Sequence, residues 1–516
     1  MRIALLTEST QSAARRGGSG WCGRLAAGLP EHEFDRYLLL PKPVSAEPGG
    51  ASPGVRAFAL GGPRPSGRLP GAVRRRQYAR AYRELVAALV LPRERASFGP
   101  GLYRLAELAA DGALPAFLAS GQAHAALEEL WRSPGADTAA GQPLLRDVLV
   151  AGDLLEQCLR PLAAPWYGDG PGGLGGADLC HVVGGGPAAL PALVAKERYG
   201  MPFLLTEHGS HLREQYLGHR LGAGSSVPVR TLLLGYARLL AAETYRQAAV
   251  LTSGSAFDRE WQLRGGAVPE RSRVVRRGLP AVSRPAAGPE PDRPTLVWVG
   301  DLAPGTDPEL MLHAFARVRA ELPGTRLRMY GGEGRPGYRA HCRSVAARLG
   351  LGGGPEPAVR FEDRPERLAE AWAAGTVLVR TDRAPHGPRL LADAMLSGRA
   401  LVATEVGLAR EVVGPGGLLV PPGEPEALAL ACRALLADQE RRARLGLAGR
   451  LRAQELFAPE SEAAAFREVY LELVAHWPAF PAGGWRAGAP PRPFARPAEF
   501  WVAGSVASDA PLAEAR

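Results

Sequence analysis

The sequence predicts an α/β protein built from two doubly wound parallel sheets. The chain has 516 residues, which is too long for one hydrophobic core, so two domains are expected. Short apolar runs such as Leu179–Val183 and Thr295–Gly300 precede turns and helical segments, as strands covered on both faces do. A stretch rich in proline and glycine, residues 280–294, separates the two groups of such units and is interpreted as a linker.

The first domain is expected over residues 1–280. It begins with a strand at residues 2–7, whereas residues 41–71 are rich in proline, glycine and serine and are expected to be irregular. From residue 72 to residue 161 apolar side chains recur at helical spacing, which predicts a helical insertion. We interpret the insertion as a packing layer, with a lid or a partner surface as the alternative.

The end of a strand in the first domain carries a candidate ligand-binding histidine. A strand at 202–206 is followed directly by Glu207 and His208. Because ligands bind beyond the carboxyl ends of strands in open α/β sheets, His208 is expected at a binding site. The alternative is a histidine that serves only the packing of the fold.

The second domain, residues 281–455, contains a unit that is typical of anion binding. Strand 376–379, loop 383–388 and helix 389–396 follow one another, and strand 400–404 follows the helix. Such a helix start presents backbone N–H groups and a positive dipole end to an anion. The alternative is an ordinary βαβ unit with a solvated loop.

The C-terminal part of the chain is expected to return to the first domain. Residues 456–475 are predicted to form a helix that crosses back to it, and residues 476–516 are predicted to form a tail rich in proline and glycine.

Composition argues against several other classes of protein. The net charge is +10, but the only lysines are Lys42 and Lys196 and the arginines are spread along the chain, so no nucleic-acid partner is predicted. The five cysteines lack the spacing of a disulfide framework or a zinc site, and reduced thiols in a cytosol are expected. No segment has the length of a signal peptide or of a membrane span, which predicts a soluble cytoplasmic protein.

Residues 385–408 read PHGPRLLADAMLSGRALVATEVGL. This text is similar to the pattern E-G-F-P-x-x-x-x-E-A-M-A-x-G-x-P-V-V-A-T-x-x-G-G of retaining glycosyltransferases of family 4, which have the GT-B fold. The residues in register are Ala394, Met395, Gly398, Val402, Ala403, Thr404 and Gly407. The words T-E-H-G and L-R-E-Q-Y-L near His208, and W-C with G-L-P-E-H-E-F near the N-terminus, resemble the PelF-like branch. The resemblance spans most of residues 1–475.

The resemblance implies an enzyme with two Rossmann-like domains that face a cleft. It implies retaining transfer of a sugar from a nucleotide-sugar donor, such as a UDP-sugar, to a glycan or other acceptor, in polysaccharide or glycoconjugate synthesis. Neither a cofactor nor a metal is expected, and membrane proteins of exopolysaccharide synthesis are expected partners.

The resemblance also implies roles for individual residues. The catalytic residues are expected to be His208 and Asp393. Donor and acceptor contacts are expected from Gly17, Gly18, Glu207, Arg276, Arg277, Gly300, His386, Gly387, Pro388, Arg389 and Leu390.

The sequence departs from the family pattern at charged positions. Pro385 stands at the first carboxylate and Asp393 at the second, while Asp301 and Thr306 replace the arginine and lysine that hold the donor diphosphate. Our hypothesis is that loop arginines replace the lost charge, namely Arg276, Arg277, Arg383 and Arg389. The alternative is that these arginines reflect only the composition. A catalytically degenerate relative that acts as a binding or partner subunit, and an unrelated doubly wound protein, therefore remain alternative functions.

Overall fold

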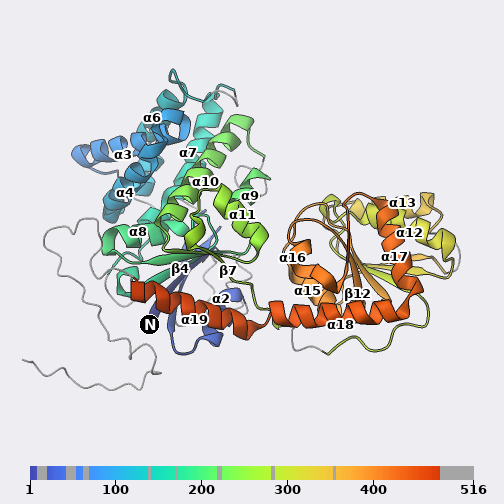
Figure 1. Cartoon of the computed structure of the whole chain (residues 1–516). Coiled ribbons are helices and arrows are strands. Elements are labelled where there is room, and N and C mark those ends of the chain that lie inside the picture. Colours follow the sequence, from blue (N-terminus) through green and yellow to red (C-terminus); the bar gives the residue numbers. More distant parts are fainter. Residues whose placement is uncertain are drawn as a thin grey trace, which may run out of the picture. The chain divides into compact units, whose positions relative to one another are not determined.

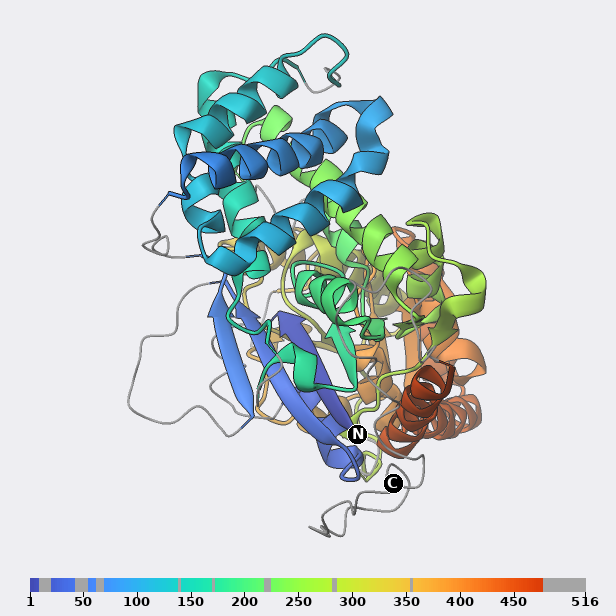
Figure 2. The same cartoon turned by 90° about the vertical axis from the view of Figure 1, so that its left-hand side faces the viewer.

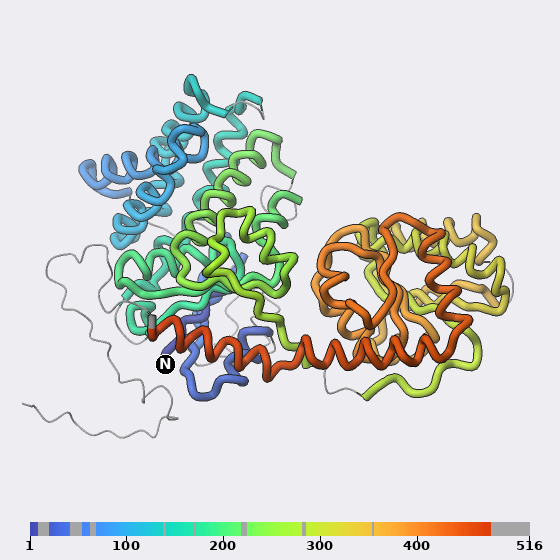
Figure 3. Tube along the Cα trace, in the orientation of Figure 1, coloured from blue at the N-terminus to red at the C-terminus, as the bar shows by residue number. Residues whose placement is uncertain are grey.

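The computed structural model describes residues 1–8, 20–41, 54–61, 69–137, 141–168, 172–217, 224–280, 285–352 and 356–476. The chain forms two compact units (Figures 1 and 3). The first consists of Met1–Gly254, Asp258–Val275 and Ala463–Arg516, and the second of Ser255–Phe257 and Arg276–Glu462. Gly17, Gly18 and most of the predicted tail lie outside the described residues.

The first unit contains a seven-stranded parallel sheet in the order β3-β2-β1-β4-β5-β6-β7. Its strands are β1 (Arg2–Glu8), β2 (Glu33–Leu40), β3 (Val55–Ala59), β4 (Leu179–Val183), β5 (Phe203–Glu207), β6 (Val250–Ser253) and β7 (Ser272–Val274). Its helices are α2 (Trp21–Gly28), α3 (Ala72–Val90), α4 (Phe98–Leu108), α5 (Leu114–Leu118), α6 (Gly121–Trp131), α7 (Leu145–Leu159), α8 (Ala189–Tyr199), α9 (His211–Tyr216), α10 (Val227–Gln247) and α11 (Ala256–Arg264).

The expectation that residues 41–71 are irregular is wrong at β3. This strand pairs in parallel with β2, with Arg36 opposite Val55, and forms one edge of the sheet. Its five residues are all at least partly exposed and lie between segments rich in proline and glycine. The strand is therefore too short and too weakly apolar to stand out in the sequence, and pairing with β2 decides its conformation.

Alternate side chains of β1 pack into two hydrophobic cores on opposite faces of the sheet. Ala4 and Leu6 pack on the side of α8, α10 and the predicted helical insertion, which α3 to α7 form as expected. Ile3 packs on the other side with Trp21 of α2 and with Phe466 of α19 (Pro459–His476). The sheet is thus covered on both faces, and the insertion extends beyond it as a separate helical layer (Figure 2).

The second unit contains a six-stranded parallel sheet in the order β10-β9-β8-β11-β12-β13. Its strands are β8 (Thr295–Val299), β9 (Arg326–Tyr330), β10 (Val359–Glu362), β11 (Val377–Arg380), β12 (Ala400–Thr404) and β13 (Leu418–Val420). Its helices are α12 (Pro308–Glu321), α13 (Tyr338–Arg348), α14 (Leu368–Ala373), α15 (Arg389–Leu396), α16 (Ala409–Val413), α17 (Pro425–Ala437) and α18 (Gln439–Leu456), and α19 begins here before it continues in the first unit.

The second sheet is also covered on both faces. Leu296 and Trp298 of β8 pack with α12 and α17, whereas Val297 and Val299 pack with α15, α16 and α18. The predicted fold class, two doubly wound parallel sheets with a helical insertion in the first, is confirmed. In both sheets the strand order reverses beside the first strand, at β1/β4 and at β8/β11, and these are the points where such sheets bind ligands.

No helix within the described part of the chain combines the length and the apolar character that are needed to cross a membrane.

Candidate functional site

His208 lies directly beyond the carboxyl end of β5, in the turn before α9. Its ring contacts the indole ring of Trp21 edge to face, with the centroids 4.7 Å apart. Gly254, which follows the neighbouring strand β6, approaches it so closely that an added Cβ would lie 3.5 Å from Nδ1. The histidine is half-buried, and its position at a strand end agrees with the place expected for a ligand-binding residue.

Glu207 points into the first unit and not into solvent. Its carboxylate accepts hydrogen bonds from the hydroxyl of Tyr245 at 2.8 Å, from the amide of Gln262 at 3.0 Å and from the backbone N–H of His211 at 3.2 Å. Burial raises the pKa of Glu207 despite these donors. Glu207 therefore ties the turn that carries His208 to α9, α10 and α11, and its predicted contact with substrate stays a prediction.

The glycine-rich turn after β4 makes room for this arrangement. A side chain at Gly185 would collide with the carboxylate of Glu207, and one at Gly186 would collide with the carboxylate of Glu8 and meet the His211 ring at 2.6 Å. Gly184 adopts a φ of +97°, which favours glycine. The turn is thus required for close packing beside His208.

A buried polar chain below His208 was missed in the sequence. Nδ1 of His181 lies 2.7 Å from the Tyr470 hydroxyl and its Nε2 lies 2.7 Å from the Thr206 hydroxyl, which itself lies 2.6 Å from the Thr252 hydroxyl. The signal was the presence of His181, Thr206 and Thr252 in the otherwise mostly apolar runs LCHVV, FLLTE and VLTS. The chain links α19 to β4, β5 and β6 and supports the strand ends that carry the site.

Burial, helped by the charge of His208, lowers the pKa of His181 to about 3. This pKa is lower than that of a histidine in the unfolded chain. Neutral His181 therefore stabilises the folded state fully above about pH 6.5, and this stabilisation is lost as the pH falls. We expect His181 to account for a loss of about 2 kcal/mol in the free energy of unfolding between about pH 7 and pH 5. Urea unfolding of the wild type and of His181→Gln at both pH values measures it, because glutamine does not titrate. Parallel pH dependences of the two proteins would contradict the assignment.

In the second unit, the segments after the carboxyl ends of β8 and β11 carry most of the remaining predicted residues. Gly300 directly follows β8, and an added Cβ would meet the Trp298 ring at 2.9 Å and the guanidinium of Arg380 at 3.0 Å. An added side chain at Gly331, after β9, would collide with the carbonyl oxygen of Gly300. Gly407 has a φ of +58° and packs against Pro385. Glycines therefore allow these loops to approach one another closely.

The predicted anion-binding helix begins where the sequence placed it. Helix α15 starts at Arg389, and its N-cap residue, Pro388, makes no side-chain capping hydrogen bond. Gly387 precedes it with nothing within 4 Å of an added Cβ, so the space beside the helix start is open. The first-turn N–H groups, including that of Leu390, are thus available to an anion. Asp393 lies in the same helix and is buried.

Two of the proposed replacement arginines already have carboxylate partners. Arg276 donates a hydrogen bond to Glu411 at 2.7 Å, and Arg383 is bonded to the buried Asp307. Arg389 is different, because its side chain is 75% exposed and its Nε lies 3.8 Å from Asp393. Arg277 is half-buried. Arg389 is therefore the most accessible of these cations.

A buried ion pair beside His386 is a second feature that the sequence did not reveal. Arg380 is the last residue of β11, and only 2% of it is exposed. Its guanidinium donates hydrogen bonds to both carboxylate oxygens of Asp382, at 2.6 and 2.8 Å, and another to the Val299 carbonyl oxygen. His386 Nδ1 lies 3.3 Å from Asp382. This hydrogen bond raises the pKa of His386. Burial opposes ionisation of Asp382, but His386 and Arg380 together lower its pKa. The predicted strand ended one residue earlier, at Val379, which hid the inward position of Arg380.

Comparison with known families identifies the first half of the chain. Residues 1–270 match the family described as "Domain of unknown function (DUF3492)". The chain belongs to the DUF3492 family. Beyond the DUF3492 region, residues 293–438 match the family described as "Glycosyl transferases group 1". This second match covers β8 to α17 and therefore includes the loops with His386 and Gly387.

Curated proteins similar to this DUF3492 protein include a glycosyltransferase and a sugar-phosphate synthase by name. The D-inositol 3-phosphate glycosyltransferase of a Nocardioides species is 28% identical over 304 residues, which cover 54% of this chain and 63% of the relative. The alpha-maltose-1-phosphate synthase of Mycolicibacterium smegmatis is 28% identical over 301 residues, with coverage of 54% and 74%. The chain thus spans less than two thirds of the length of the first of these relatives.

Solved structures of GT-B glycosyltransferases share the fold of this DUF3492 protein. Sucrose-phosphate synthase from Thermosynechococcus elongatus superposes with a TM-score of 0.54 at 18% identity, over 92% of this chain and 99% of that one. HepE of Anabaena, solved with UDP and glucose, gives 0.52 at 17% identity, over 91% and 98%. At these identities the likeness shows the GT-B fold.

Proposed function

We propose that the chain is a retaining glycosyltransferase of family 4, from the PelF-like branch, that moves a sugar from a nucleotide-sugar donor to a glycan. The match of residues 293–438 to glycosyl transferases of group 1 carries this proposal. The uncapped start of α15 within the matched region supplies a place for the donor diphosphate. Because HepE was solved with UDP, we favour a UDP-sugar as the donor. Polysaccharide synthesis, with membrane proteins as partners, remains part of the proposal.

The proposed chemistry assigns a role to several of the predicted residues. The backbone N–H groups of Gly387, Arg389 and Leu390 bind the diphosphate and stabilise the negative charge that develops on it as the sugar leaves. Asp393 binds donor hydroxyl groups, and His208 contacts the sugar near its reacting carbon. Asp382 pairs with Arg380 and lies 3.3 Å from His386, which supports a fixed β11–α15 loop, and the proposal assigns His386 to the diphosphate.

A catalytically degenerate relative that acts as a binding or partner subunit is the second candidate. It is favoured by Asp301, a carboxylate at the position of a family cation, and by the carboxylate partners of Arg276 and Arg383. Incubation with UDP-, GDP- and ADP-sugars, followed by assays of donor hydrolysis and transfer, separates the two functions. Turnover of at least one donor is expected. Nucleotide binding that raises the melting temperature without any turnover would favour the second candidate.

Loss of the displaced cations is expected to weaken nucleotide binding. The triple variant Arg276→Ala, Arg277→Ala, Arg389→Ala should lower the affinity for UDP or GDP by about 100-fold, because charge-assisted hydrogen bonds contribute about 1.5–3 kcal/mol each. Titration calorimetry measures it. The matched control replaces three arginines of the same unit, Arg343, Arg348 and Arg360, which lie on α13 and β10, and should retain the wild-type affinity. Equal affinity of both triple variants would rule out the displaced cations.

A further inference from the structure

A pocket in the first unit lies between the helical insertion and α10, away from the strand ends that carry His208. Its volume is about 170 Å³, well above the about 10–15 Å³ that one ordered water needs. One wall is a face of α10 formed by residues on successive turns, from Pro228 to Arg238. The opposite wall is the end of α3 and the following 3-10 helix η1 (Pro92–Ser97), with Arg95.

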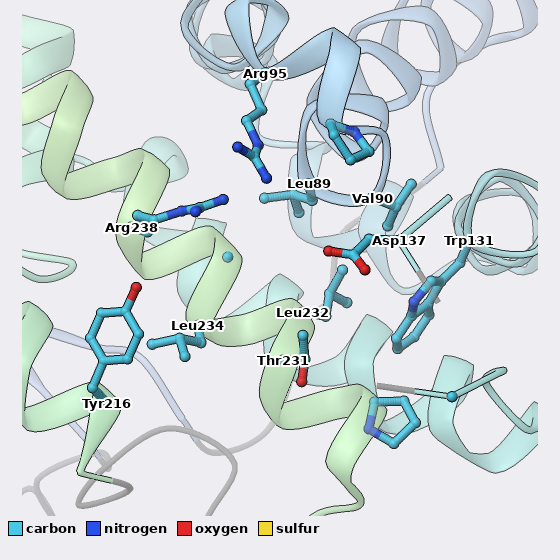
Figure 4. Close-up of a pocket in the computed structure, with 14 residues that line it drawn as sticks. Leu89, Val90, Arg95, Trp131, Asp137, Tyr216, Thr231, Leu232, Leu234 and Arg238 are labelled. Atoms are coloured by element: carbon cyan, nitrogen blue, oxygen red, sulfur yellow. The ribbon is translucent and has the colours of Figure 1, made fainter. Parts of the chain in front are cut away.

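Two guanidinium groups share this pocket, and no counterion for them is found among the described residues. Arg95 and Arg238 lie on different elements, and Figure 4 shows both side chains directed towards each other, to the left of Leu89 in the view. Within the part of the chain that the structure describes, neither side chain has a hydrogen-bond or ion-pair partner. This differs from the cations of the second unit described above, where Arg276, Arg380 and Arg383 are bonded to carboxylates.

The rest of the lining fits a ligand with both an anionic and a neutral part. Tyr216 carries a hydroxyl group on the same side as Arg238, and the hydroxyl of Thr231 lies further along α10 (Figure 4). Leu89 and Leu232 supply apolar surface between these polar groups. Asp137, the one carboxylate among the described lining residues, is shown beside Trp131 and apart from the two guanidinium groups.

We propose that this pocket binds the phosphate or carboxylate group of a small sugar-like ligand between Arg95 and Arg238. Guanidinium groups match both anions through paired N–H donors, and two of them that converge without a counterion raise the local concentration of anions. The hydroxyl groups of Tyr216 and Thr231 then bind the neutral part of the ligand. None of the residues predicted to bind the donor lines this pocket.

Gly235 provides a way to close the pocket without changing its charge. It lies in the middle of α10, and an added Cβ would be 3.8 Å from the carbonyl oxygen of Leu89, which is ordinary contact. A methionine at this position therefore fits the helix, and its longer side chain extends into the pocket. Since glycine is a poor helix former, Gly235→Met should fold at least as well as the wild type.

The test is calorimetric titration of the full chain, in the presence of saturating UDP, with glucose 1-phosphate, glucuronate and glucose as probes. We expect glucose 1-phosphate or glucuronate to bind with a Kd of about 1 mM, and glucose to bind at least tenfold more weakly. Tighter binding of glucose 1-phosphate assigns a phosphate ligand, and tighter binding of glucuronate a carboxylate ligand. Both Arg95→Gln/Arg238→Gln and Gly235→Met should weaken binding about tenfold or more.

The control is Arg93→Gln/Arg230→Gln, which removes the same charge from η1 and α10 at exposed positions outside the pocket lining. It should bind the probes as the wild type does. The proposal is overturned if neither anion binds at concentrations well above 1 mM, or if the pocket variants bind as tightly as the control. If UDP itself fails to bind, the proposed function is wrong. Probe binding by the pocket variants and the control still tests the proposed pocket, because it concerns another site.

Discussion

His208→Ala is expected to lower the rate of sugar transfer by about 100-fold or more, with little change in UDP affinity. The reason is the place of His208 at the end of β5, where Trp21 and the Gly254 turn hold its ring. A positioned histidine that contacts the reacting group contributes about 10²–10⁴ in rate. Initial rates with the donor identified in the panel of nucleotide sugars, and UDP titration of the same variant, measure the two quantities separately.

The matched control for this histidine is His313→Ala. His313 lies on α12 in the second unit and is exposed. Its loss should leave both the rate and the UDP affinity within about twofold of the wild type. An equal rate for His208→Ala and the wild type would remove His208 from the mechanism. A parallel loss of UDP affinity would instead assign to it a role in donor binding.

Arg380→Met is expected to destabilise the second unit by about 3–5 kcal/mol. Arg380 is buried and binds Asp382, whose side chain is only 13% exposed, so its removal leaves a carboxylate with little access to water. The carbonyl of Val299 also loses a donor. Urea unfolding followed by circular dichroism measures the change. The double variant Arg380→Met/Asp382→Leu should recover most of it, because the whole ion pair is then absent.

Arg389→Met is the control for this change. The Arg389 side chain is 75% exposed at the start of α15, and its replacement should change the free energy of unfolding by no more than about 0.5 kcal/mol. A cost below about 1 kcal/mol for Arg380→Met, or a double variant as unstable as the single one, would show that the buried pair does not stabilise the loop.

The sequence predicted much of the fold because apolar periodicity directly reports burial on two faces. The runs LCHVV and TLVWV lie in the centres of the two sheets, and the helical spacing after residue 72 matches α3. The prediction missed β3, because an edge strand with partly exposed residues carries little apolar signal.

The sequence likewise predicted some features of the candidate site and not others. Local pattern was sufficient to place His208 after a strand and Gly387 before a helix, since each position depends only on neighbouring residues. It was insufficient for the partners of charged side chains. Glu207 turned out to be bonded inside the first unit, and Arg276 is bonded to Glu411, which lies 135 residues further along the chain.

The sequence by itself determined two parallel-sheet units, the turns at the ends of their strands and the open start of α15, because hydrophobic spacing and glycine act locally. Only the tertiary structure decided which cations have counterions. It joined Arg383 to Asp307 and left Arg95 and Arg238, which are 143 residues apart in the numbering, in one pocket without a described partner. Charge pairing depends on distances between segments that are remote in the chain, and packing alone sets these distances.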